Sequence, residues 1–111
     1  MKIITAMIQP FMLNKVTSAL KAIEGFPGMT VTEARGFGRR RSLHEQRAPH
    51  IEEFKDKTRI EIVTPDEKAQ QIVETLVRAA HTGNSGDGKV FVWPVGTAIR
   101  IQTGETGDEA L

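Results

Sequence analysis

The chain has 111 residues, with 15 Lys and Arg against 14 Asp and Glu, giving a formal net charge of +1. This length and an ordinary charged fraction of 26% suit one globular domain over residues 1–111, and the near-zero net charge argues against general attraction to nucleic acid or membranes. The absence of cysteine excludes disulfide bonds and thiolate metal sites.

The first residues carry no signal-peptide pattern, and no apolar run reaches the length of a membrane span. A cysteine-free chain also fits a reducing compartment. We therefore expect a cytoplasmic protein without membrane insertion.

The first half of the chain predicts a strand, a helix and a second strand. Residues 2–8 are mostly apolar and β-prone, which is typical of a buried strand. Asn14 offers an N-cap for a helix with apolar residues at helical spacing, and residues 25–28 contain the glycines and proline that end it. Residues 29–37 then alternate as a half-buried strand.

Residues 39–56 differ from their surroundings. They carry dense charge of both signs, two histidines and Pro49, without a period of 2 or 3.6 residues. A loop of this length in a small domain is usually functional or disordered. We expect a long mobile loop that binds a partner.

The second half predicts a further strand, helix and strand. Residues 58–63 alternate as a strand, and Thr64, Pro65 and Glu67 form a helix-start signal that precedes an apolar stripe. Residues 90–95 and the shorter 98–102 are expected to be strands.

The predicted order is βαββαβ with a short additional strand near the C-terminal end. This order indicates a ferredoxin-like α+β fold, in which an antiparallel sheet carries two helices on one face. The other face of the sheet is left uncovered, and we expect oligomerisation to cover it.

A glycine-rich loop lies between the second helix and the following strand. Gly83 to Lys89 fit the spacing of a P-loop, but Val90 replaces the magnesium-binding Ser or Thr, and the order helix, loop, strand is reversed. Glycines allow backbone N–H groups to surround an anion, and the lysine adds a charge. The loop therefore indicates a phosphate site of another kind, with a plain surface turn as the alternative.

Several segments resemble the PII signal-transduction family. They are Thr30-Val-Thr-Glu33 with Gly36-Phe-Gly-Arg39, Ile60-Glu-Ile-Val63, Arg78-Ala-Ala-His-Thr-Gly83, Gly86-Asp-Gly-Lys-Val-Phe-Val92, and Ile99-Arg100 with Thr103-Gly-Glu-Thr-Gly107. The resemblance covers nearly the whole chain except residues 39–56.

The resemblance implies a homotrimer that binds ATP or ADP between subunits, as effectors rather than tightly bound cofactors. It implies a regulatory protein, not an enzyme, that controls a transporter or enzyme partner through residues 39–56. That loop is called the T-loop in the family.

The resemblance also implies a set of nucleotide-binding residues. They are Met7, Thr30, Gly36, Gly38, Arg39, Val63, Gly86, Asp87, Gly88, Lys89 and Arg100, with Arg100 supplied across the subunit interface. Lys57 matches a lysine that pairs with an effector carboxylate or with the T-loop.

Three positions depart from the family pattern. The chain has no tyrosine, and His50 stands where modified members carry one, so uridylylation there is impossible. Arg40 replaces a magnesium-coordinating glutamine, and a guanidinium has no lone pair for a metal, so little magnesium-dependent 2-oxoglutarate sensing is expected. Gln102 replaces a second phosphate-binding arginine.

Two alternatives stay open. One is a metal-responsive trimer linked to metal efflux that uses His44 and His50, although their spacing matches no standard zinc site. The other is a slow phosphohydrolase on the same fold. The Arg39–Arg41 run lacks the interleaved aromatic residues of a nucleic-acid site, so no nucleic-acid partner is expected.

Overall fold

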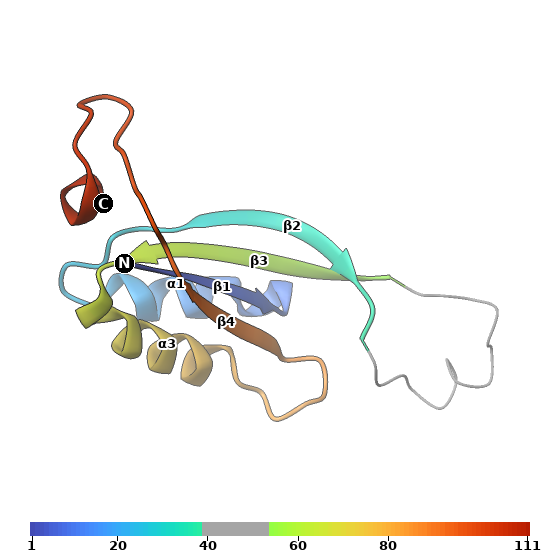
Figure 1. The fold of residues 1–111 in the computed structure, drawn as a ribbon. Helices are drawn as coiled ribbons and strands as arrows, with labels where there is room; N and C mark the ends of the chain where they lie inside the picture. Colours follow the sequence, from blue (N-terminus) through green and yellow to red (C-terminus); the bar gives the residue numbers. More distant parts are fainter. Residues whose placement is uncertain (39–53) are drawn as a thin grey trace.

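A computed structural model describes residues 1–38 and 54–111. Its four antiparallel strands form one sheet in the order β2-β3-β1-β4 (Figure 1). The strands are β1 (Lys2–Ile8), β2 (Thr30–Gly36), β3 (Lys55–Thr64) and β4 (Gly88–Pro94). The expectations for residues 39–53 lie outside the described part of the chain.

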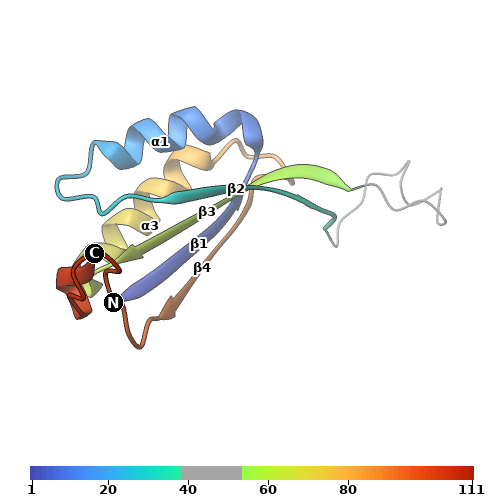
Figure 2. The same ribbon diagram turned by 90° about the horizontal axis from the view of Figure 1, so that it is seen from above.

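Two helices, α1 (Leu13–Lys21) and α3 (Asp66–Ala80), cover one face of the sheet (Figures 1 and 2). There are also two short 3-10 helices in the described ranges. The first, η1 (Pro10–Met12), follows β1, and the second, η2 (Gly107–Ala110), lies near the C-terminal end. The element order confirms the ferredoxin-like α+β fold. No helix in the described ranges is long and apolar enough to cross a membrane.

The core lies between the helices and the two central strands. Alternation places one set of β1 and β3 side chains toward α1 and α3, where they are shielded from water. This set and the helix residues packed on it are fully or almost fully buried: Ile4, Ala6, Ile8, Val16, Leu20, Ile60, Ile62, Ile72 and Leu76.

The opposite face of the sheet carries no helix (Figure 2). Phe91 and Trp93 of β4 lie on it and are 47% and 46% exposed, while their neighbours Thr5 and Ile3 on β1 are better covered. Aromatic side chains in such a position are typical of a surface that a partner covers.

Both helix starts differ from the expected capping. Helix α1 is preceded directly by η1, so its N-cap is Met12, and Asn14 lies inside the helix. Helix α3 has Pro65 as its N-cap without a side-chain cap. Thr64 is fully buried and its hydroxyl donates to the carbonyl of Pro65 at 3.2 Å, so it caps nothing.

The strand bounds also differ from expectation. Lys55 and Asp56, expected in the loop, belong to β3 because they pair with Gly36 and Arg35 in a two-stranded extension of the sheet. Strand β4 begins at Gly88. The short strand expected over residues 98–102 is only a single bridge between Ile99 and Thr106.

Candidate functional site

The glycine-rich loop between α3 and β4 is closed by the carboxylate of Asp87. One carboxylate oxygen accepts backbone N–H bonds from Thr82 at 2.7 Å and Gly83 at 2.8 Å, and the other accepts the hydroxyl of Thr82. The backbone N–H of Asp87 donates to the carbonyl of Asn84 at 3.3 Å. These bonds give the loop a defined shape without a ligand.

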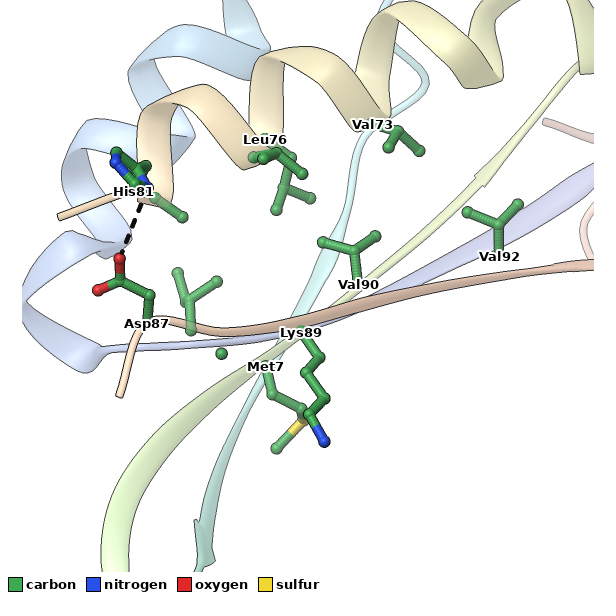
Figure 3. Close-up of a pocket in the computed structure, with 12 residues that line it drawn as sticks. Met7, Val73, Leu76, His81, Asp87, Lys89, Val90 and Val92 are labelled. Carbon is green, nitrogen blue, oxygen red and sulfur yellow. Dashed lines mark ion pairs between the residues drawn. The ribbon is translucent and has the colours of Figure 1, made fainter. Parts of the chain in front are cut away.

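The same bonds set the charge state of Asp87. The hydroxyl of Thr82 is the main cause of a pKa below the usual value of 3.8, followed by the backbone N–H of Thr82. Burial opposes this lowering of the pKa, and Gly83 and His81 add smaller lowering effects. His81 Nδ1 lies 3.8 Å from the carboxylate (Figure 3). Asp87 is therefore ionised at neutral pH, and its carboxylate stabilises the conformation of the loop by accepting bonds from Thr82 and Gly83.

A positive φ is needed where the loop enters β4. Gly88 has φ of 107°, and a Cβ there would overlap the backbone oxygen of Met7. Only glycine fits this approach between β4 and β1. The position of Gly88 therefore fixes where Lys89 emerges from the loop.

Lys89 and Met7 are cross-strand partners on the uncovered face of the sheet. Figure 3 shows both side chains on the side of β4 opposite to Val90 and Val92. The ammonium group of Lys89 therefore points toward the face that carries no helix, beside the glycine-rich loop.

A second lysine reaches the loop from β3. Lys57 Nζ donates to the carbonyl of Gly86 at 3.1 Å, across 29 residues of sequence. A Cβ at Gly86 would meet the amide of Gln9, so this side chain also packs against the loop. The structure thus brings together Met7, Lys57, Gly86 and Lys89.

An open groove of about 420 Å³ lies on the other side of β4, toward α3 (Figure 3). Its lining is mainly apolar, and the residues at the end near the glycine-rich loop are polar or small. The apolar residues include Val73, Leu76, Val77, Ala80, Val90 and Val92, and the others are His81, Asp87, Gly88 and Lys89. The side chain of Lys89 points away from the valines of this groove (Figure 3), so the open face of the sheet is the better candidate for an anion.

Other predicted residues lie apart from this cluster within one chain. Gly36 and Gly38 lie at the end of β2, where residues 39–53 begin. Thr30 is on the edge strand β2, and Val63 is four residues along β3 from Arg59, the residue opposite Met7. At about 3.3 Å per residue along the strand, Val63 lies roughly 13 Å from the level of Met7 and Lys89.

Arg100 is the most distant of the predicted residues. It follows β4 in the C-terminal hairpin, and Figure 1 shows this segment at the end of the sheet opposite to the glycine-rich loop. Within one chain Arg100 and Lys89 therefore do not form a common site.

Some predicted positions lie outside the described residues, namely Arg39, Arg40, His44 and His50. Within residues 1–38 and 54–111 no cluster of three or more His, Cys, Asp or Glu residues could hold a metal ion.

Sequence reasoning missed the roles of Gln9, Thr82 and His81. A threonine five residues before an aspartate, across a glycine-rich turn, is a signal that could have indicated the Thr82–Asp87 bonds. The contacts of Gln9 and Lys57 with Gly86 had no comparable local signal.

Comparison with known proteins gives the family. The model of the family described as "Nitrogen regulatory protein P-II" matches residues 1–105. Nitrogen regulatory protein P-II of Haemophilus influenzae is 46% identical, and P-II 1 of Escherichia coli is 47% identical, each over the full length of both chains. These relatives are named as regulatory proteins.

A solved structure agrees with this assignment. The PII protein of Arabidopsis thaliana, in a crystal structure with bound citrate, superposes with a TM-score of 0.81. It is 34% identical, and the match covers 99% of this chain and 91% of that one. With its ferredoxin-like sheet, its glycine-rich loop and this full-length similarity, the chain belongs to the nitrogen regulatory protein P-II family.

Proposed function

We propose that this protein is a homotrimeric regulatory protein that senses ATP and ADP and controls a transporter or enzyme partner through the loop that joins β2 to β3. The observation that carries the proposal is the preformed loop from Thr82 to Gly88, with Lys89 and Lys57 beside it. A loop of fixed shape with two flanking ammonium groups suits a polyphosphate.

The position of Lys57 supports a link between nucleotide and partner. Lys57 contacts the phosphate loop through Gly86 and lies on β3, the strand that residues 39–53 enter. A nucleotide phosphate that competes for the Lys57 ammonium group would weaken its bond to Gly86. This change would occur close to the point where residues 39–53 join β3. ATP and ADP differ by one phosphate, so they would favour different conformations of the loop that joins β2 to β3. A partner would then bind one of these conformations.

The position of Arg100 supports a site shared between subunits. Arg100 belongs to the hairpin after β4, and Figure 1 shows this segment at the end of the sheet opposite to the glycine-rich loop. We therefore expect it to approach the glycine-rich loop of another copy. The uncovered sheet face with Phe91 and Trp93 offers the contact surface. A head-to-tail ring joins two different surfaces at every interface, as such a site requires.

Titration calorimetry with ATP and ADP tests the proposal. Lys89→Ala should weaken both ligands roughly 10- to 100-fold, because a charged hydrogen bond contributes about 1.5–3 kcal/mol. Lys15→Ala, which removes an exposed charge from α1, is the matched control and should bind like the wild type. Equal affinity of the Lys89→Ala variant would contradict the phosphate role of the loop.

A parallel assay of phosphate release separates sensing from hydrolysis. The proposal expects nucleotide binding without steady turnover. Continuous release of phosphate that stops in the Lys89→Ala variant would favour the phosphohydrolase instead.

A further inference from the structure

The side chain of Arg100 is engaged within its own chain. Its Nη2 donates to the main-chain oxygen of Leu111 at 3.0 Å, and its Nε lies 3.9 Å from the carboxylate of Glu105. The hydroxyl of Thr103 donates to the same Glu105 oxygen at 2.8 Å and holds that carboxylate toward Arg100. A ligand phosphate would have to replace these contacts.

The hairpin that carries Arg100 does not depend on them. Main-chain bonds from Arg100 to Glu105 at 2.8 Å, from Gly104 to Arg100 at 2.7 Å, and from Gly107 to Ala98 at 3.0 Å close it. The guanidinium can therefore leave Glu105 and Leu111 while the hairpin keeps its shape.

The contacts of Arg100 are also weak enough to exchange. The side chains of Arg100 and Glu105 are 43% and 46% exposed, and ion pairs this open to water contribute little. Arginine binds phosphate through a planar fork of donors and prefers that geometry to a single contact 3.9 Å away.

The 3-10 helix η2 depends on Arg100 more than the hairpin does. This four-residue element ends with the N–H of Leu111 donating to the carbonyl of Asp108 at 3.2 Å. The bond from Arg100 ties Leu111 back to the hairpin. Loss of that bond leaves the end of η2 with its local bond alone.

We propose that Arg100 exchanges partners when a nucleotide binds. In the structure, Leu111 and Glu105 hold the guanidinium of Arg100. Phosphates bound by a neighbouring subunit take the guanidinium from them and release η2. Glu105 is then a competitor that lowers nucleotide affinity, and η2 responds to occupancy at the end of the sheet opposite to the glycine-rich loop. This inference rests on the proposed function, in which Arg100 reaches the phosphates.

The competition predicts a definite effect of Glu105. Apparent affinity falls in proportion to the fraction of molecules whose Arg100 is free to bind. Glu105→Gln removes the charge but keeps an oxygen that can accept the bond from Thr103. ATP affinity should rise roughly two- to five-fold, the range that exposed ion pairs allow.

Calorimetry with ATP on four full-length proteins tests this effect: the wild type, Glu105→Gln, Arg100→Ala and the double variant. Arg100→Ala should weaken ATP, and Glu105→Gln should then have no further effect, because the residue it competes for is gone. Glu109→Gln, which removes the same charge from η2, is the control for general electrostatics and should match the wild type.

Hydrogen exchange gives the second measurement. Saturating ATP should speed exchange of the Leu111 amide and leave the Gly104 amide unchanged, because Gly104 lies in the hairpin and outside η2. An unchanged Leu111 amide would overturn the release of η2.

The outcomes separate the two proposals. Suppose that the wild type binds ATP through Lys89. If Glu105→Gln then leaves ATP affinity unchanged, or raises it equally in the Arg100→Ala background, the partner exchange is wrong. The proposed function still stands in that case. If the wild type binds neither ATP nor ADP, the proposed function fails, and the inference fails with it.

Discussion

The side chain of Asp87 shows how one residue fixes the shape of the glycine-rich loop. Its carboxylate accepts two backbone N–H bonds and one hydroxyl, so the loop is closed by a negative charge before any ligand arrives. A negative charge inside an anion-binding loop is unfavourable unless cations outweigh it. Lys89 and Lys57 provide these cations on the open side.

Asp87→Asn should lower the melting temperature at neutral pH. The folded-state pKa of Asp87 is below 3.8, so its stabilising effect is complete above pH 3.8 and is lost as the pH falls through the lowered value. The difference between wild type and variant should therefore shrink at the acid end of a series of melting curves.

The control for this series is Asp56→Asn, which removes an exposed carboxylate from β3. At neutral pH this variant should melt like the wild type. A constant difference between Asp87→Asn and wild type down to pH 3 would mean that the carboxylate charge does not hold the loop.

At the scale of elements, a hydrogen bond from Lys57 to Gly86 joins β3 to the glycine-rich loop. Strand β3 continues beyond the sheet as a two-stranded extension with β2, so a shift at Lys57 lies at the root of that extension. Phe37 and Phe54 close its far end in an edge-to-face contact with ring centres 5.1 Å apart. The extension can thus pass a change from the phosphate loop toward residues 39–53.

Lys57→Met should uncouple nucleotide from the loop. Trypsin is expected to cut wild-type protein first at Arg40, Arg41 or Arg47, at a rate that ATP changes. In Lys57→Met, ATP should still bind, more weakly, but the cutting rate should no longer respond to it.

Arg59→Met is the matched control, because Arg59 is also a cation on β3 but pairs with Glu61 rather than with the phosphate loop. It should keep the response to ATP. If Lys57→Met keeps the same response at saturating ATP, the Lys57–Gly86 contact does not carry the signal.

The elements themselves could be predicted from sequence because each has a local periodic signal. The fold was predicted from two periodic patterns: the alternation in β1 and β3, and the helical spacing of Ile72 and Leu76. Capping was less predictable. The local pattern favoured Thr64 as the cap of α3, but its side chain is buried in the folded protein and bonds to the carbonyl of Pro65 instead.

The site could be predicted only where its signal was local. The glycine-rich loop and Lys89 are adjacent in sequence, so their pattern indicated an anion site. Lys57 and Gly86 meet only because β1 places β3 and the loop side by side, and no short pattern encodes such a contact.

At the scale of the whole molecule, the uncovered sheet face and the projecting C-terminal hairpin both point to assembly. Ile99 and Ile101 of that hairpin are 61% and 101% exposed, and Phe91 and Trp93 are about half exposed on the sheet. Apolar side chains gathered on two separate surfaces suit a ring, in which each copy contacts two neighbours.

Sedimentation equilibrium should give a mass three times the 12.3 kDa of one chain. Phe91→Glu should lower that mass by placing a charge in the buried interface. Phe11→Glu changes an exposed phenylalanine that follows β1 in η1, and should leave the trimer intact. A wild-type monomer at micromolar concentration would contradict the trimer and the shared site together.

The central claim is that nucleotide binds between subunits, with Lys89 from one and Arg100 from the next. The most direct test counts ATP sites in trimers assembled from equal amounts of Lys89→Ala and Arg100→Ala chains. Neither variant alone should have a tight site, but about one site for every four chains should return in the mixture, because random assembly joins the two intact residues at one interface in four. A mixture with no tight sites would contradict the claim.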